Sequence, residues 1–159
     1  LVKLKSNDWR LHMKKLVGLL IGVLMLTACN GTERISVEEF DIPDFFANVE
    51  IENVIHPLAK GGYTWTEKGS TVTTDHSSPN QQAEEMGSIL VSKEAEVKVS
   101  IEDQPDLAVF TWSDQGKENE IDVMQNSFHV AETPGVYVYE IVAIWKQGYR
   151  SYVLKVEVQ

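Results

Sequence analysis

Short runs of alternating apolar and polar residues dominate the second half of the chain. Residues 95–102, AEVKVSIE, alternate strictly, and such a period of two is the signature of a half-buried strand. Residues 149–158 also alternate, which predicts a second strand with one apolar face. The residues on that face are Tyr152, Leu154, Val156 and Val158.

Amphipathic helical patterns are scarce, and further segments are rich in β-branched and aromatic residues, as strands are. Thr133-Pro134-Gly135 is a turn signal, and Lys146-Gln147-Gly148 suits a hairpin connection. The pattern therefore predicts an all-β fold, a β-sandwich of about seven to eight short strands. The additional strand segments are 49–55, 62–66, 70–74, 107–112, 121–124, 127–130 and 136–145.

The hairpin from Pro134 to Val158 resembles the last two strands of bacterial immunoglobulin-like domains. In those domains the sequence Pro-Gly-x-Tyr precedes a strand in which every second side chain points into the core. Here Pro134-Gly-Val-Tyr stands in the same position. The resemblance covers about residues 94–159 and implies an immunoglobulin-like β-sandwich. It also implies that Tyr137 or Tyr139 forms a tyrosine corner, with its hydroxyl bonded to nearby backbone. The alternative architecture is another meander or a small barrel.

The first residues follow a different pattern. Residues 1–28 hold five basic residues against one acid, and an uncharged apolar run occupies Leu16–Leu26. A basic region, an apolar stretch and a small residue before the cut predict a secretory signal peptide over 1–28. The run is shorter than the ~20 residues of a transmembrane helix. Because Met13-Lys-Lys-Leu opens a compact signal, we expect Met13 to be the start and 1–12 to be an upstream artefact.

The segment Leu26-Thr-Ala-Cys29 resembles the bacterial lipobox, Leu-x-[Ala/Gly]-Cys. The resemblance implies that Cys29, the single cysteine, carries a diacylglyceryl group and becomes the first residue of the mature protein. Stable attachment takes two acyl chains, and this anchor supplies two. We therefore expect a lipid-anchored protein on the extracytoplasmic face of the membrane, with no cofactor besides the anchor. The alternatives are a buried free cysteine or an uncleaved core helix.

A further segment is similar to one found in extracytoplasmic lipoproteins and sensor ectodomains of Gram-positive bacteria. It consists of Gly61-Gly-Tyr-Thr-Trp65 followed by Thr74-Asp75 and Ser78-Pro79. Together with the lipobox, this similarity identifies the chain as a bacterial membrane lipoprotein of Gram-positive type. It implies no catalytic or binding residue.

After the predicted signal peptide, the chain divides into an acidic stretch and a domain. Residues 29–47 form an acidic stretch interrupted by Pro43, which we expect to be a tether before a domain at 48–159. From Cys29 onward the chain has 9 basic and 23 acidic residues, a formal charge of −14. Such a surface lacks the basic patch of a nucleic-acid binder. It is also repelled by anionic head groups, so the domain should stand off the membrane.

No catalytic motif is evident in the sequence. The histidines His56, His76 and His129 have no metal-ligand spacing, and no G-x-S-x-G, P-loop or G-x-G-x-x-G occurs. The best candidate for a cation is the acidic stretch around Gly116, because oxygen ligands near a glycine can hold Ca²⁺. Its order does not match an EF-hand, and the alternative is a solvated acidic loop. The acids are Asp114, Glu118, Glu120 and Asp122.

Aromatic residues offer a second candidate site. Tyr63 and Trp65 are two positions apart and therefore share one face of a predicted strand. If that strand lies at a sheet edge, the two rings could stack on a sugar or a peptide. The alternative is that the tryptophans fill the core of the sandwich.

These features predict a surface-tethered, non-catalytic interaction module. We expect it to contact a protein or an envelope polymer, either alone or as an accessory of a membrane protein. The alternative function is binding of a small ligand, a glycan or calcium. A transporter's solute-binding lipoprotein and a cell-envelope enzyme agree less well with the chain's length and motifs.

Overall fold

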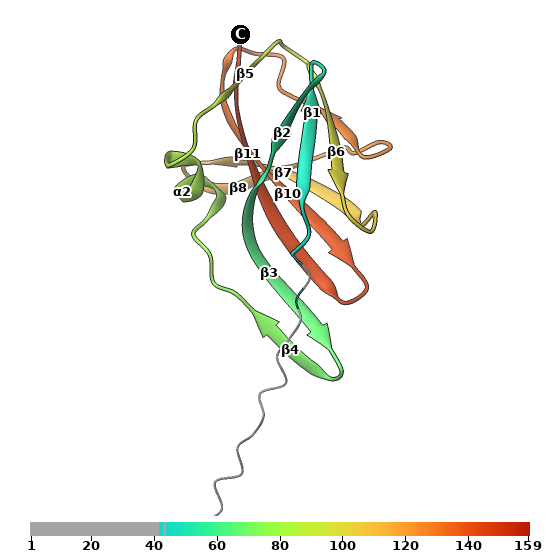
Figure 1. Ribbon diagram of the computed structural model, residues 1–159. Coiled ribbons are helices and arrows are strands. Elements are labelled where there is room, and N and C mark those ends of the chain that lie inside the picture. The colour runs from blue at the N-terminus through green and yellow to red at the C-terminus, as the bar shows by residue number, and fades with distance from the viewer. Residues whose placement is uncertain (1–41, 43) are drawn as a thin grey trace, which may run out of the picture. The chain divides into compact units, whose positions relative to one another are not determined.

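The computed structural model describes Ile42 and residues 44–159. These residues form an all-β fold of eleven strands and one short helix, with two sheets in a sandwich-like arrangement (Figure 1). The predicted all-β sandwich is thereby confirmed. The smaller sheet has the order β2-β1-β6-β9. Its strands are β1 (Ala47–Ile51), β2 (Val54–Pro57), β6 (Glu96–Ile101) and β9 (Ser127–His129).

The larger sheet has the order β4-β3-β11-β10-β7-β8, and β5 adds to it by pairing in parallel with the end of β11. Its strands are β3 (Ala59–Glu67), β4 (Ser70–Thr73), β5 (Ile89–Val91), β7 (Asp106–Ser113), β8 (Gly116–Ile121), β10 (Gly135–Trp145) and β11 (Gly148–Val158). In the larger sheet β10 lies between β11 and β7, and in the smaller sheet β6 lies between β1 and β9.

Three strands, β2, β5 and β8, were not among the predicted segments. The predicted strand at 121–124 does not form, because β8 ends at Ile121 and Met124 makes only an isolated bridge with Ser127. The alternation of residues 49–55 predicted one strand, but Glu52 and Asn53 adopt left-handed φ values of 52° and 64°. A two-residue turn of this kind closes a tight hairpin, so the segment forms β1 and β2. The predicted acidic loop around Gly116 is likewise a hairpin, in which β8 returns along β7.

The core lies between the two sheets and follows the predicted alternation. In β11, Tyr152, Leu154, Val156 and Val158 are all buried. They pack with buried side chains of β6 and β10 in one cluster. Burying each large apolar side chain contributes about 1.5–3 kcal/mol. The alternating faces of these three strands, together with those of β1 and β9, therefore form the interface between the sheets.

The short helix α2 (Pro79–Glu84) contacts β11, β10 and β7 of the larger sheet. It begins with a capping box, since Ser78 and Gln81 each accept a hydrogen bond from the other's backbone N–H. At its other end Lys155 of β11 donates hydrogen bonds to the carbonyls of Ala83, at 2.7 Å, and Met86, at 3.1 Å. A cation at this end satisfies carbonyls that the helix leaves free.

Both candidate tyrosine-corner residues bond to nearby backbone. The hydroxyl of Tyr137 donates to the carbonyl of Thr133 at 3.1 Å. The hydroxyl of Tyr139 accepts from the backbone N–H of Ala131 at 3.0 Å. The two bonds fix the loop that precedes β10, as a tyrosine corner does.

The close pairing of β3 with β11 requires a glycine at position 148. A Cβ added to Gly148 would lie 1.9 Å from the carbonyl oxygen of Thr64, whereas one added to Gly87 would have no atom within 4 Å. We expect Gly148→Ala to lower the free energy of unfolding by about 1–3 kcal/mol, as overpacking does. Gly87→Ala should leave it nearly unchanged. Urea denaturation of the two variants tests this, and equal midpoints would contradict it.

Candidate functional site

An open groove of about 580 Å³ lies on the outer face of the larger sheet. Alternate residues of β10 line it, while the intervening residues face the core. The other walls come from β3, β7, β8, the start of β11 and the turn between β10 and β11. The residues that matter most for its chemistry are Phe110, Lys117, Glu140, Val142, Ile144 and Tyr149.

A polar centre lies in this largely apolar groove. Glu140 is only 9% exposed, although it lies on the outer face of the sheet. Its Oε2 accepts a hydrogen bond from Nε1 of Trp112 at 2.9 Å and pairs with Nζ of Lys117, also at 2.9 Å. The Lys117 ammonium lies 4.1 Å from the centre of the Phe110 ring. These contacts are charge-assisted and cation–π interactions, which hold the carboxylate and the ammonium in place.

Apolar surface surrounds the polar centre and remains accessible. Ile144 and Tyr149 are 43% and 45% exposed, and Phe110 and Val142 are partly exposed. Binding sites for small molecules combine such apolar walls with a few fixed polar groups and commonly enclose ~300–1,000 Å³. The groove can therefore receive a ligand that has a flat apolar face and a polar edge.

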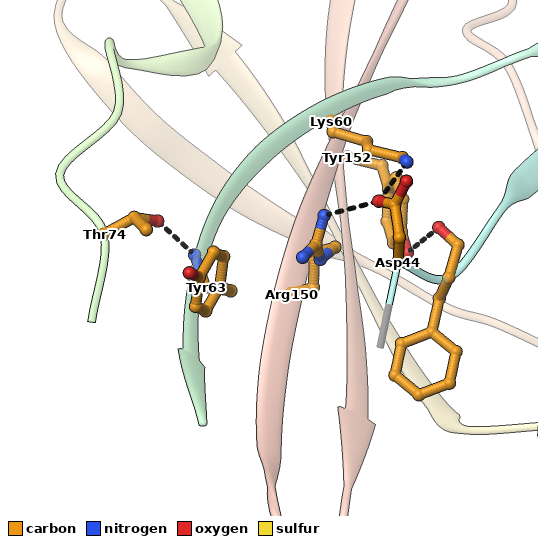
Figure 2. A network of polar contacts seen from close by, with 7 residues as sticks. Asp44, Lys60, Tyr63, Thr74, Arg150 and Tyr152 are labelled. Carbon is orange, nitrogen blue, oxygen red and sulfur yellow. Dashed lines mark hydrogen bonds and ion pairs between the residues drawn. The ribbon is translucent and has the colours of Figure 1, made fainter. Parts of the chain in front are cut away.

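A second polar cluster joins the start of the domain to the larger sheet. Figure 2 shows Asp44 between Lys60 of β3 and Arg150 of β11. Asp44 bonds directly to Lys60, and its Oδ1 lies 3.7 Å from the Arg150 guanidinium. The hydrogen bond from Lys60 is the main reason why the pKa of Asp44 lies below its usual 3.8. These ion pairs fix the residue that directly precedes the first buried side chain, Phe45.

Phe45 connects this cluster to the groove. Its ring stacks on Trp145 with centroids 4.3 Å apart, and Trp145 also lines the groove. The backbone carbonyl of Phe45 accepts a hydrogen bond from the Tyr152 hydroxyl at 3.1 Å. Tyr152 is fully buried, and this burial raises its pKa to about 12. The segment before β1 is thus packed against the same aromatic side chain that forms part of the groove wall.

The predicted aromatic surface at Tyr63 and Trp65 is not formed as expected. Trp65 is only 5% exposed, because it packs against Phe45 and Trp145. Tyr63 is half-buried, with the Arg150 guanidinium 4.9 Å from its ring (Figure 2). Their strand, β3, is not at the edge of the sheet, since β4 pairs with it on its outer side. Trp65 therefore presents no ring to a ligand, and its role is in the core.

The structure also does not gather the candidate calcium ligands. Asp114 lies in the β7–β8 turn, Glu118 and Glu120 extend along β8, and Asp122 follows that strand. Same-face neighbours on a strand are about 6.6 Å apart, so these acids spread along β8 instead of surrounding a cation. Within Ile42 and residues 44–159, no three His, Cys, Asp or Glu side chains are placed to hold a metal ion.

The predicted signal peptide over 1–28, the lipidation site Cys29 and most of the tether lie outside the described residues. They remain predictions from the sequence. In the part of the chain that the structure describes, no helix has the length and apolar character needed to cross a membrane.

The groove was missed by sequence reasoning, although one signal for it exists. Glu140 is the only charged residue in the otherwise apolar and aromatic strand 136–145. A lone acid in such a strand needs a partner, because burying an unpaired charge is unfavourable. Its partners, Trp112 and Lys117, are 28 and 23 positions away, and only the pairing of β7 with β8 and β10 brings them together.

Comparison with known proteins yields no match for this chain among protein-family models, curated proteins or solved structures.

The ion pairs of Asp44 predict a dependence of stability on acid pH. Its pKa is lowered in the folded state, so its contribution is complete above about pH 3.8 and is lost as the pH falls through the folded value. We expect wild type to be more stable than Asp44→Asn at pH 7, and the difference in the free energy of unfolding to shrink below pH 4. Asp114→Asn, in the exposed β7–β8 turn, is the control. A difference that stays constant from pH 7 to pH 2.5 would contradict this role of the Asp44 carboxylate.

Proposed function

We propose that the protein is a lipid-anchored, non-catalytic binding module on the extracytoplasmic face of a bacterial membrane. The anchor is the diacylglyceryl group on Cys29, as the lipobox Leu26–Cys29 after a basic and apolar segment implies. The folded domain at the end of the tether supplies the binding surface. The proposed surface is the groove on the outer face of the larger sheet.

The observation that carries the binding role is the fixed polar centre inside the apolar groove. Glu140 and Lys117 hold each other at 2.9 Å, and Trp112 bonds to the same carboxylate oxygen. These contacts within the protein hold the side chains in place, so binding would not require the groove to order them first. A polar pair in this position supports recognition of a specific ligand over general apolar adhesion.

The chemistry of the groove favours a sugar ring of an envelope polymer as the ligand. A sugar ring has apolar C–H faces, which stack on aromatic side chains such as Tyr149 and Phe110. Its hydroxyls can donate to a carboxylate such as that of Glu140 and accept from an ammonium such as that of Lys117. Lys146, which also lines the groove, adds a further donor. A peptide or a small amphipathic molecule is the alternative ligand, and binding assays separate them.

The proposed lipid anchor predicts that a substitution of Cys29 changes the location of the protein. Cys29→Ser removes the sulfur that carries the diacylglyceryl group, so the domain should no longer be retained by the membrane. We expect cell fractionation and immunoblotting to find the wild type in the membrane fraction. The variant should be secreted or remain as an unprocessed precursor of higher mass. A variant that is processed normally and stays on the membrane would contradict the anchor.

The groove predicts which aromatic residue matters for binding. Tyr149→Ala removes an exposed ring from the groove, whereas Val136→Ala removes a similarly exposed apolar group of β10 outside it. Losing one stacked ring costs about 0.5–1.5 kcal/mol beyond its buried area. We therefore expect about a tenfold weaker association of Tyr149→Ala with insoluble cell-wall glycan in a co-sedimentation assay.

The Val136→Ala variant should sediment with the glycan as the wild type does, and soluble cell-wall fragments should compete. Equal binding by all three proteins would place the binding surface elsewhere. If the wild type binds no glycan but crosslinks to an envelope protein through the groove, the ligand class is a polypeptide.

A further inference from the structure

The outer side of β4 is an open sheet edge. β4 is the last strand of the larger sheet, and within the described residues it pairs only with β3. The N–H of Thr74 donates to the carbonyl of Tyr63 at 3.0 Å, so Thr74 turns its backbone toward β3. Backbone direction alternates along an antiparallel strand, and Val72 therefore also faces β3. The backbone groups of Thr71 and Thr73 face away from β3, toward the open edge.

This edge is short, but it lacks the charges, prolines and bulges that usually prevent pairing between sheets. Natural edge strands carry charged residues, prolines or bulges that block association with another strand. The opposite edge of the same sheet, β8, carries Lys117, Glu118 and Glu120. In contrast, β4 has the sequence STVT, which is uncharged and rich in β-branched residues. The hairpin of β3 and β4 extends from the end of the sandwich opposite the C terminus, where a partner strand could approach it (Figure 1).

Threonine hydroxyls already join β4 to its one neighbour. The hydroxyls of Thr64 and Thr73 are 3.1 Å apart, and those of Thr66 and Thr71 are 2.8 Å apart. Thr–Thr pairs of this kind stabilise antiparallel strands. Because Thr71 and Thr73 lie on either side of Val72, the strand has nearly the same sequence in both directions. In an antiparallel pair of two β4 strands, Thr71 of each copy would lie opposite Thr73 of the other.

We propose that β4 pairs with β4 of a second copy of this chain, antiparallel and about a twofold axis at Val72, which joins two larger sheets edge to edge. In this register the outward backbone groups of Thr71 and Thr73 form hydrogen-bonded pairs with their counterparts. The two Val72 residues face each other in a non-hydrogen-bonded pair, with Cα atoms about 4.5 Å apart.

Charge also favours this register. The pairing that sets Val72 opposite its copy places Asp75 of one chain opposite Gly69 of the other. Gly69 belongs to the Lys68-Gly69 turn of the β3–β4 hairpin, so Asp75 lies near Lys68 of the partner copy. Both residues are exposed, and the twofold axis creates this contact twice. Strand β4 can pair with its own copy, and opposite charges then meet at both of its ends, which indicates a second copy as the partner. These contacts also counter the repulsion between two acidic chains.

Disulfide trapping tests the proposed register. Val72→Cys would place two thiols at a Cα separation that a disulfide spans. We expect membranes carrying the full-length Val72→Cys protein to form covalent dimers rapidly under mild oxidation, seen on non-reducing gels. Val136→Cys, on β10, is more exposed than position 72 and should still form at least tenfold less dimer, and the unsubstituted chain controls for Cys29. Equal trapping at positions 72 and 136, or trapping of Val72→Cys to a different protein, would overturn the proposal.

A charge exchange tests the contact at the ends of the strand. In the Val72→Cys background, Asp75→Lys should reduce the dimer several-fold, because it places two lysines together at each end. Adding Lys68→Asp restores opposite charges and should restore the dimer. Thr71→Lys, a charge on the edge itself, should abolish it. Unchanged melting temperatures would show that all variants fold, and a failure of the double exchange to rescue would overturn the register.

Discussion

Strand β11 is the element on which the rest of the structure depends. It pairs with β10 along its whole length, and on its other side with β3 and then with β5. Its alternating side chains carry the core, while Arg150, Tyr152 and Lys155 hold Asp44, Phe45 and helix α2. Strands β3, β5 and β10, helix α2 and the segment before β1 are therefore all attached to this strand, and the close approach at Gly148 fixes where β3 joins it.

One aromatic residue, Trp145, contacts both the start of the domain and the groove. Trp145 stacks on Phe45 and also lines the groove. The ion pairs of Asp44 with Lys60 and Arg150 hold Phe45 at this position, so the segment that leads to the predicted tether supports the groove wall. The binding surface that we propose is consequently part of the rigid sheet and does not consist of a mobile loop.

The sequence pattern predicted the all-β class and the buried face of β11 because both depend on local alternation. It did not separate β1 from β2, because the alternation that begins at Val49 runs on through Glu52, where the left-handed backbone of Glu52 and Asn53 reverses the chain. It left open whether Trp65 lies on a surface or in the core, because the position of β3 between β4 and β11 is a property of non-local pairing. The groove was missed for the same reason, since its polar centre joins side chains of three strands.

Site-specific photo-crosslinking in living cells tests the central claim, that the groove on the larger sheet is the binding surface, most directly. A photoreactive phenylalanine analogue would replace Tyr149 in the groove or, as the control, the exposed Leu90 of β5. The account predicts crosslinks to cell-wall glycan from position 149 and background labelling from position 90. No product from position 149, or equal products from both positions, would contradict it.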